Sequence, residues 1–357
     1  MSRVRGLMRR SWILLLLSIL AGCAPADDDV EGRDLEYRLE LQLGSTSGGG
    51  ELPGRPTDLV HRPDGSWIVF AGFGMPQRFD STGQYLGEIG RSGEGPGEYA
   101  AAMVGTGLPG DSLLILDVRL ARASVLGPDL EFARAVSWPG QVGRVEPVAW
   151  PDTVLAVLWP RGLPGASHRV GSFAGPAFTE YAMFGDPWPE RDFDRTIRFR
   201  RFASRPQEGE LWTAAGDAYR LRRWSLTGDS LGSLGIRSRL FDREGMGFGP
   251  DSIPQTAIVA IQELTGDSLL IGLSVAHEAW HEAWEGVKSS GPEMRGPPET
   301  DLWEGVVEIR DGESGTLIGS QRLDGVIVEI FPDGRVATYD EVGAGFPVVR
   351  IYSREAS

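Results

Sequence analysis

The 357-residue sequence predicts an all-β fold built from repeated small antiparallel sheets. Three observations lead to this prediction. Apolar residues almost nowhere recur at the 3.6-residue period of a helix. Short runs rich in Val, Ile, Leu, Phe and Trp are instead separated by Gly, Asp and Pro, which favour turns. These runs recur as a unit about every 40 to 60 residues, the spacing of repeat architectures.

The clearest unit runs over residues 55–99 and contains four expected strands. In chain order they lie at 57–61, 66–70, 78–80 and 85–89. The turn Pro63-Asp64-Gly65 joins the first two strands, and Ser81-Thr82-Gly83 joins the last two. Four strands joined in this way form one antiparallel sheet, which is the blade of a β-propeller.

The same unit resembles a known repeat in three places, in the same order. Asp64-Gly65 and the following strand match "DG-x-hydrophobic-x-V", Phe79-Asp80 begins a match to "FD-x-x-G-x-hydrophobic", and residues 90–99 match a glycine-rich tail that ends in an aromatic residue. Together they resemble the NHL-type repeat. The tail looks like the inter-blade turn of bacterial lipoproteins with a six-bladed, NHL-repeat or TolB-like propeller. The resemblance implies a six-bladed propeller.

Weaker copies of the unit follow along the chain, and each again opens on a turn residue. They begin at Gly110, Pro151, Gly209, Gly266 and Pro332. The sequence therefore predicts a six-bladed β-propeller of four-stranded antiparallel blades.

The sixth unit is one strand short, because the sequence ends soon after Tyr352. At the other end, the alternating segment 37–43 has no unit of its own. Propellers commonly close by pairing a strand from one terminus into the blade of the other, which removes two open edges. We therefore expect residues 36–44 to complete the last blade as an N-terminal closing strand.

The first 22 residues have the pattern of an export signal. Four arginines precede an apolar core at 12–20, which is too short to span about 30 Å of hydrocarbon. The next motif, Leu20-Ala21-Gly22-Cys23, resembles the lipobox of bacterial lipoproteins, which implies cleavage before Cys23 and lipid attachment to it. The alternative is a generic secretory signal followed by an incidental cysteine. Ala24, in place of Asp, resembles the sorting pattern of outer-membrane lipoproteins.

These observations divide the chain into a signal peptide at 1–22, a lipidated cysteine with an acidic tether at 23–35, and a propeller at 36–357. Because Cys23 is the only cysteine, no intrachain disulfide can form. The net charge of −15 at pH 7 repels phosphate backbones and anionic headgroups. We therefore expect no nucleic-acid partner, and membrane attachment through the lipid only.

The motif His277-Glu278-Ala279-Trp280-His281 matches the HExxH pattern of zinc peptidases. A third ligand would be needed, and Glu299 or Glu304 lies at a plausible distance along the chain. The context argues against the site, because the motif follows an expected blade strand at 269–275 and leads into sequence rich in Gly and Pro. In the lipoproteins that this chain resembles, an irregular loop containing Trp falls here. A zinc peptidase and an incidental surface zinc site stay as alternatives.

Calcium-dependent propeller hydrolases of the lactonase and gluconolactonase kind are a second enzymatic alternative. They hold their metal with carboxylates and asparagine oxygens. This sequence contains no asparagine, so those ligands cannot be transferred to any position here. A site made from Asp, Gln and backbone carbonyls is chemically possible.

Other motifs have simpler explanations. The glycine-rich run at 90–97 lacks the Lys-Ser/Thr ending of a phosphate loop and precedes no helix, so it is predicted to be a turn. Aspartates beside turn glycines are expected to cap those turns through backbone hydrogen bonds. They are Asp64, Asp111, Asp152, Asp267 and Asp333. Arginines that alternate with apolar residues predict a solvated strand face, or a site for an anionic ligand. They are Arg195, Arg198, Arg200 and Arg201.

Three insertions, at 184–195, 238–255 and 276–301, are longer than hairpin turns and are expected to form the binding surface. We expect no catalytic residue, no cofactor and no resident metal. The predicted function is a monomeric, non-enzymatic scaffold, lipid-anchored in the cell envelope, that binds an envelope protein or a small molecule. A metal-dependent hydrolase or lyase and a zinc peptidase through His277 and His281 are the alternatives.

Overall fold

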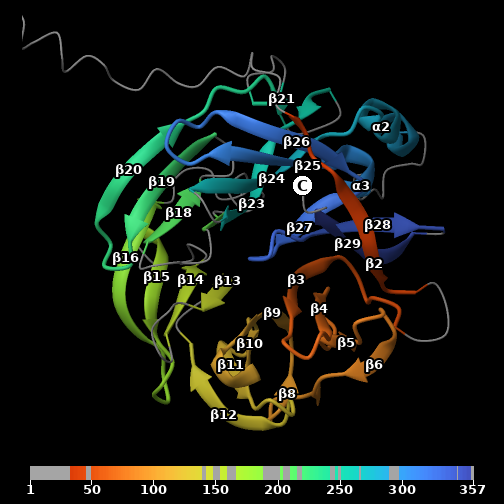
Figure 1. The fold of residues 1–357 in the computed structure, drawn as a ribbon. Coiled ribbons are helices and arrows are strands. Elements are labelled where there is room, and N and C mark those ends of the chain that lie inside the picture. The colour runs from red at the N-terminus through yellow and green to blue at the C-terminus, as the bar shows by residue number, and fades with distance from the viewer. Residues whose placement is uncertain are drawn as a thin grey trace, which may run out of the picture.

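The computed structural model shows six small antiparallel sheets arranged in a ring (Figure 1). The described residues are 33–45, 50–138, 142–147, 153–158, 166–187, 202–203, 210–214, 219–241, 246–247, 251–264, 267–288, 297–343 and 345–354. Each sheet is one blade, so the fold is the six-bladed β-propeller that the sequence predicts.

The blades are numbered in chain order, and the strands of each blade are given from the central axis outward. Blade 1 contains β3 (Pro56–His61), β4 (Trp67–Ala71), β5 (Gln77–Phe79) and β6 (Tyr85–Glu88). Blade 2 contains β9 (Ala102–Gly107), β10 (Leu113–Asp117), β11 (Arg122–Leu126) and β12 (Phe132–Ser137). Blade 3 contains β13 (Val142–Pro147), β14 (Thr153–Leu158), β15 (Ala166–Ser172) and β16 (Thr179–Pro187).

The second half of the ring repeats this arrangement. Blade 4 contains β17 (Phe202–Ala203), β18 (Glu210–Ala214), β19 (Arg220–Ser225) and β20 (Ser230–Gly235). Blade 5 contains β23 (Ala257–Leu264), β24 (Ser268–Ala276), β25 (Trp303–Asp311) and β26 (Leu317–Leu323). Blade 6 contains β27 (Val326–Ile330), β28 (Val336–Val342), β29 (Phe346–Arg354) and, as its outer strand, β2 (Tyr37–Leu43).

The ring closes through its N-terminal strand, as the sequence predicts. Strand β2 pairs antiparallel with β29, from Tyr37 opposite Arg354 to Leu43 opposite Val349. The two ends of the propeller are therefore joined within blade 6. A further short strand, β1 (Arg33–Asp34), pairs parallel with β26 at the outer edge of blade 5.

The core is divided among the seams between blades. Buried apolar side chains of the described residues fall into six clusters, and each cluster joins residues of two neighbouring blades. In blade 1, Ile68 and Phe70 of β4 belong to the cluster shared with blade 2. Trp67 and Val69 of the same strand belong to the cluster shared with blade 6. A second strand of a blade is thus buried on both faces, which explains its continuous apolar sequence.

The remaining elements lie in the connections between strands. Two parallel pairs of short strands are β7 (Arg91–Ser92) with β8 (Glu98–Tyr99), and β21 (Met246–Gly247) with β22 (Ile253–Pro254). The helical elements described are η1 (Pro109–Asp111), α2 (Trp280–Lys288) and α3 (Glu299–Leu302). In the part of the chain that the structure describes, none of these helices has the length and apolar character needed to span a bilayer.

Candidate functional site

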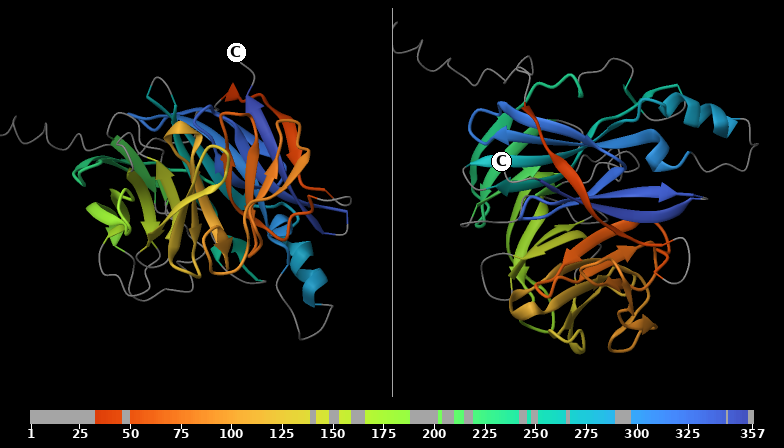
Figure 2. Two further views of the ribbon diagram at one scale, coloured as in Figure 1. Left: turned by 90° about the horizontal axis from the view of Figure 1, so that it is seen from below. Right: turned by 45° about the vertical axis from the view of Figure 1, so that its right-hand side comes forward.

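The alternation of strand direction gives the propeller two different faces. The turns between the first and second strands define the turn face, and those described fully lie at 62–66, 108–112 and 331–335. The loop face carries the connections at 72–76, 89–101, 118–121 and 277–302, the last with a gap at 289–296. Both ends of the propeller lie on the turn face, because the hydroxyl of Tyr37 donates to the carbonyl of Gly334, 3.0 Å away, and Tyr37 pairs with Arg354. Figure 2 shows the C-terminus and helix α2 on opposite sides of the ring.

Inner strands carry a β-bulge close to the loop face, where they begin. The pairing register shifts near the start of β3, β9, β13, β23 and β27. In β3 the extra residue is Thr57, between Pro56 and Asp58. Bulges redirect side chains and are common at the rims of barrels and beside active sites. Here they recur around the loop-face end of the central axis.

Polar side chains at the bulge of blade 1 connect this blade to blade 2. Thr57 Oγ1 donates to the carbonyl of Met103, 2.6 Å away, at the bulge of blade 2. The buried carboxylate of Asp58 accepts from the backbone N–H of Gly105, 3.0 Å away, and from that of Leu59. These contacts were not predicted from the sequence. An aspartate inside an apolar strand, which needs hydrogen-bond donors when it is buried, could have indicated them.

The glycine-rich run at 90–97 forms a folded connection on the loop face, as predicted. Glu98 accepts from the N–H of Gly95 at 2.8 Å and from Arg91, and these hydrogen bonds lower the pKa of the Glu98 carboxyl. The guanidinium of Arg122 in blade 2 donates to the carbonyls of Glu94, Gly95 and Glu98. The loop therefore directs backbone carbonyls at a positively charged arginine. A phosphate-binding loop does the opposite, because it directs backbone N–H groups at an anion.

The insertion in blade 5 contains a helix, although no helix was predicted at the HExxH motif from the sequence. Helix α2 begins at Trp280, so His277 lies before it and His281 lies within it. His277 Nδ1 accepts from the N–H of Ala279 at 3.1 Å and so caps the start of this helix. His281 Nδ1 lies 3.6 Å from Glu285, and the His281 side chain is 60% exposed. The two histidines therefore do not form a pair on one helical face.

The two expected third ligands of that motif form ion pairs with arginines. Glu299 contacts Arg55, and Glu304 contacts Arg322. Among the described residues, no three His, Cys, Asp or Glu side chains gather closely enough to hold a metal ion.

The contact between Arg55 and Glu299 joins blades that are not adjacent in the ring. Arg55 directly precedes β3 of blade 1, whereas Glu299 begins α3 in the insertion of blade 5. Between them, the Tyr339 hydroxyl of blade 6 donates to Glu341. Burial, followed by this hydrogen bond and the charge of Glu341, raises the pKa of Tyr339. The insertion thus crosses the loop face from blade 5 to blade 1.

An exposed aromatic residue adds to the same face. Phe73, in the 72–76 connection, is 76% exposed. Covering a large exposed apolar side chain with a partner lowers the free energy, because it removes apolar surface from water. The loop face therefore combines an apolar contact point with long connections and ion pairs.

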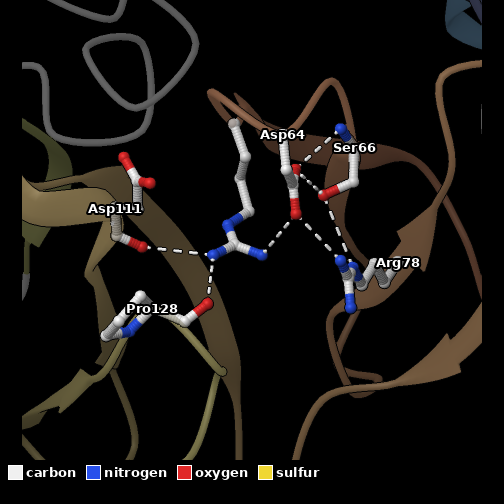
Figure 3. A network of polar contacts seen from close by, with 6 residues as sticks. Asp64, Ser66, Arg78, Asp111 and Pro128 are labelled. Atoms are coloured by element: carbon white, nitrogen blue, oxygen red, sulfur yellow. Dashed lines mark hydrogen bonds and ion pairs between the residues drawn. The ribbon is translucent and has the colours of Figure 1, made fainter.

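On the turn face, by contrast, polar groups satisfy one another across a seam (Figure 3). The buried guanidinium of Arg62 in blade 1 donates to the blade 2 carbonyls of Asp111, at 3.2 Å, and Pro128, at 2.6 Å. It also contacts Asp64, which in turn accepts from Arg78 at 2.9 Å. This network holds blades 1 and 2 together and explains why an arginine is buried there.

Two of the predicted turn caps are confirmed. Asp64 accepts from the N–H of Ser66 at 2.9 Å, and Asp333 accepts from that of Arg335 at 3.1 Å. Asp111 and Asp267 instead adopt positive φ angles of 61° and 57°, a conformation that Asp tolerates better than most residues. Asp152 lies outside the described residues.

Sequence reasoning also missed a buried charged group between blades 4 and 5. Arg310 Nε of β25 donates to Glu308 at 2.8 Å and to the Tyr219 hydroxyl at 3.0 Å. Arg310 Nη1 donates to the carbonyl of Gly315 at 2.9 Å, and the Tyr219 hydroxyl donates to Glu308. Burial and the charge of Glu308 raise the pKa of Tyr219 well above its ordinary value. The signal in the sequence was a pair of opposite charges two residues apart in an apolar strand.

Several predicted residues fall outside the described part of the chain. These are Cys23, the arginines at 195, 198, 200 and 201, and residues 188–195 of the insertion at 184–195. The insertion at 238–255 is described in part and contains the parallel pair of β21 and β22.

No family model matches the sequence, and no curated protein matches it. Among solved structures, the fold is similar to that of a DUF4221 family member from Bacteroides vulgatus. Its TM-score is 0.60 at 9% identity, and the match covers 92% of this chain and 100% of the other. A presumed exported protein from Bacteroides fragilis is similar with a TM-score of 0.55 at 11% identity, over 93% and 99% of the two chains. At such low identities, the likeness shows the shared propeller fold only.

Proposed function

We propose that this chain is a lipid-anchored envelope protein whose propeller is a non-enzymatic scaffold that binds an envelope protein or a small-molecule ligand on its loop face. The observation that supports the proposal most directly is the position of the chain ends. The residues that would connect to an acylated Cys23 precede β1, at the outer edge of blade 5, and β2 then begins at Tyr37 on the turn face. The loop face is therefore directed away from the expected anchor.

The distribution of polar contacts supports the same face. Arg62 and Asp64 of the turn face are engaged in holding neighbouring blades and their own turns. The loop face carries Phe73 with its ring exposed and the inserted helix α2. Binding residues are concentrated on loops that a rigid scaffold positions, and the six packed seams supply such a scaffold.

Export and acylation are tested by replacing the expected lipid site. The wild-type protein and Cys23→Ala, each with a C-terminal tag, are expressed in a bacterium fed an alkyne-labelled fatty acid. We expect label and membrane fractionation for the wild type, and an unlabelled, folded protein outside the membrane fraction for Cys23→Ala. An unlabelled wild type, or equal fractionation of both proteins, would contradict the anchor.

Binding is tested separately by crosslinking in native membranes, followed by purification through the tag. We expect a discrete partner or a co-purifying small molecule with the wild type. A protein that is acylated and yet isolated without any bound species would contradict the scaffold role and leave the anchor intact.

A further inference from the structure

The seam that closes the ring, between blades 6 and 1, brings a histidine against an arginine on the turn face. His61 is the last residue of β3, and Arg335 directly precedes β28. Arg335 Nη2 lies 2.9 Å from His61 Nδ1. The guanidinium carbon of Arg335 lies 4.8 Å from the centre of the Trp67 ring, and the His61 ring lies 4.3 Å from that ring. Trp67 is buried in the cluster shared by blades 6 and 1.

The direction of the His61 hydrogen bond follows from the chemistry of its partner. A guanidinium has donors and no acceptor, so His61 Nδ1 must accept and must carry a lone pair. The imidazole in this arrangement is therefore neutral, with its proton on Nε2. Adding a second proton, at Nδ1, would form the imidazolium, remove the acceptor and place two donors and two positive charges against each other.

Charged groups from three elements face His61. Arg335 and Asp333 come from the turn of blade 6, Glu40 comes from β2, and Asp64 comes from the turn of blade 1. The three carboxylates favour protonation, but burial and the charge of Arg335 prevail and lower the pKa of His61 below its ordinary value. Asp333 stays ionised, because its hydrogen bonds to Arg335 and the positive charge of Arg335 outweigh its burial and lower its pKa.

We propose that His61 makes the closing seam sensitive to acid, because protonation of His61 releases Arg335 and weakens the contact between blades 6 and 1. This seam adjoins the two ends of the propeller, because blade 6 contains the paired strands β2 and β29. The physiological consequence rests on the export proposed above: a chain outside the cytoplasm would meet the pH of its surroundings, and acidification would loosen the contact between the last and the first blade.

The sign of the effect follows from proton linkage. An unfolded chain binds a proton at His61 with a pKa of about 6.5, and the folded chain binds it less readily. The contribution of His61 to stability is therefore full above about pH 6.5 and is lost as the pH falls from there towards the folded pKa. With one proton involved, the unfolding equilibrium constant rises by at most about tenfold per pH unit in that window.

The test compares urea unfolding between about pH 5 and 8 for the wild type, His61→Gln and His281→Gln. Glutamine keeps an acceptor for Arg335 and does not titrate, and His281 is an exposed control on the loop face. We expect the acid-induced loss of stability to shrink in His61→Gln and to persist in His281→Gln. An equal loss in the wild type and His61→Gln would overturn the proposal.

Two further measurements apply even if His61→Gln fails to fold. Arg335→Gln removes the opposing charge, so the acid-dependent loss should again be smaller than in the wild type. Amide hydrogen exchange of the wild type, corrected for the intrinsic rate at each pH, should show acid-induced opening in β2, β29 and β3 ahead of the other strands. Exchange that accelerates equally in all blades, or an unchanged acid dependence in Arg335→Gln, would contradict the mechanism.

Discussion

Two glycines lie within blade strands at positions where an aromatic ring packs against the backbone. A Cβ atom on Gly105 of β9 would lie 2.2 Å from the Phe70 ring of blade 1. A Cβ on Gly171 of β15 would lie 2.5 Å from the ring of Phe178. Neither glycine is needed for a turn, because both lie within paired strands. The small size of Gly105 sets the distance between blades 1 and 2, and that of Gly171 sets the packing within blade 3.

Gly105→Ala is therefore expected to destabilise the domain by about 1–3 kcal/mol, the usual cost of overpacking. Gly232→Ala is a matched control, because Gly232 lies in β20 and its Cβ would meet no atom within 4 Å. That control should be neutral, or stabilising by up to about 1 kcal/mol. Urea unfolding of the two variants measures the difference, and equal stabilities would contradict the packing account.

The buried charges at the seam of blades 4 and 5 are a second feature at this scale. Replacing Glu308 with Met leaves Arg310 buried without its carboxylate, which should cost about 3–5 kcal/mol. Replacing Tyr219 with Phe and both Glu308 and Arg310 with Met removes the two buried charges together and leaves only the Gly315 carbonyl without its Arg310 donor. Thermal unfolding should then show the triple variant to be more stable than Glu308→Met. The reverse order would show that the charges stabilise the seam by more than they cost to bury.

At the scale of elements, the seven-residue strand β2 closes the ring. It supplies the outer strand of blade 6 and connects the first residues of the domain to the last. Its leucines differ in burial, since Leu43 is fully buried in the closing seam, whereas Leu39 is 53% exposed. The strand therefore contributes both backbone pairing and side-chain packing to the closure.

Within this strand, Leu43→Ala should destabilise the domain by about 2–5 kcal/mol, because it leaves a cavity in the closing seam. Leu39→Ala makes the same chemical change at an exposed position and should cost less than about 0.5 kcal/mol. Thermal unfolding of both variants provides the comparison. A loss for Leu39→Ala as large as that for Leu43→Ala would argue against closure by packing.

The sequence predicted elements well where local turn chemistry repeats and poorly where tertiary contacts decide. Asp64-Gly65 and the following apolar strand identify blade 1 directly, and the unpaired alternating segment at 37–43 identifies the closing strand. Helix α2 was not expected, because its short segment follows a strand and lies beside Gly and Pro. Its start depends on the His277 side chain and on α3, which contacts blade 6. The cap is local, but histidine is not among the preferred capping residues, and the contact with α3 joins segments that are separated in the sequence.

For the molecule as a whole, the direction of the strands decides which face carries the chain ends. The sequence predicted the ring and its closing strand, but it could not relate the three insertions to the chain ends. That relation depends on Tyr37 meeting Gly334 across nearly the full length of the domain. With the ends on the turn face, the insertion that carries α2 extends from the opposite side (Figure 2).

Site-specific photocrosslinking in intact cells tests the central claim, that the loop face binds the partner. A photoreactive phenylalanine analogue is placed singly at exposed loop-face positions, at Phe73, Glu94 or Glu282, or at exposed turn-face positions, at Pro63 or Pro128. Our account predicts a crosslinked species from at least one loop-face position and none from the turn-face positions. A crosslink from Pro63 or Pro128, with none from the loop face, would contradict it.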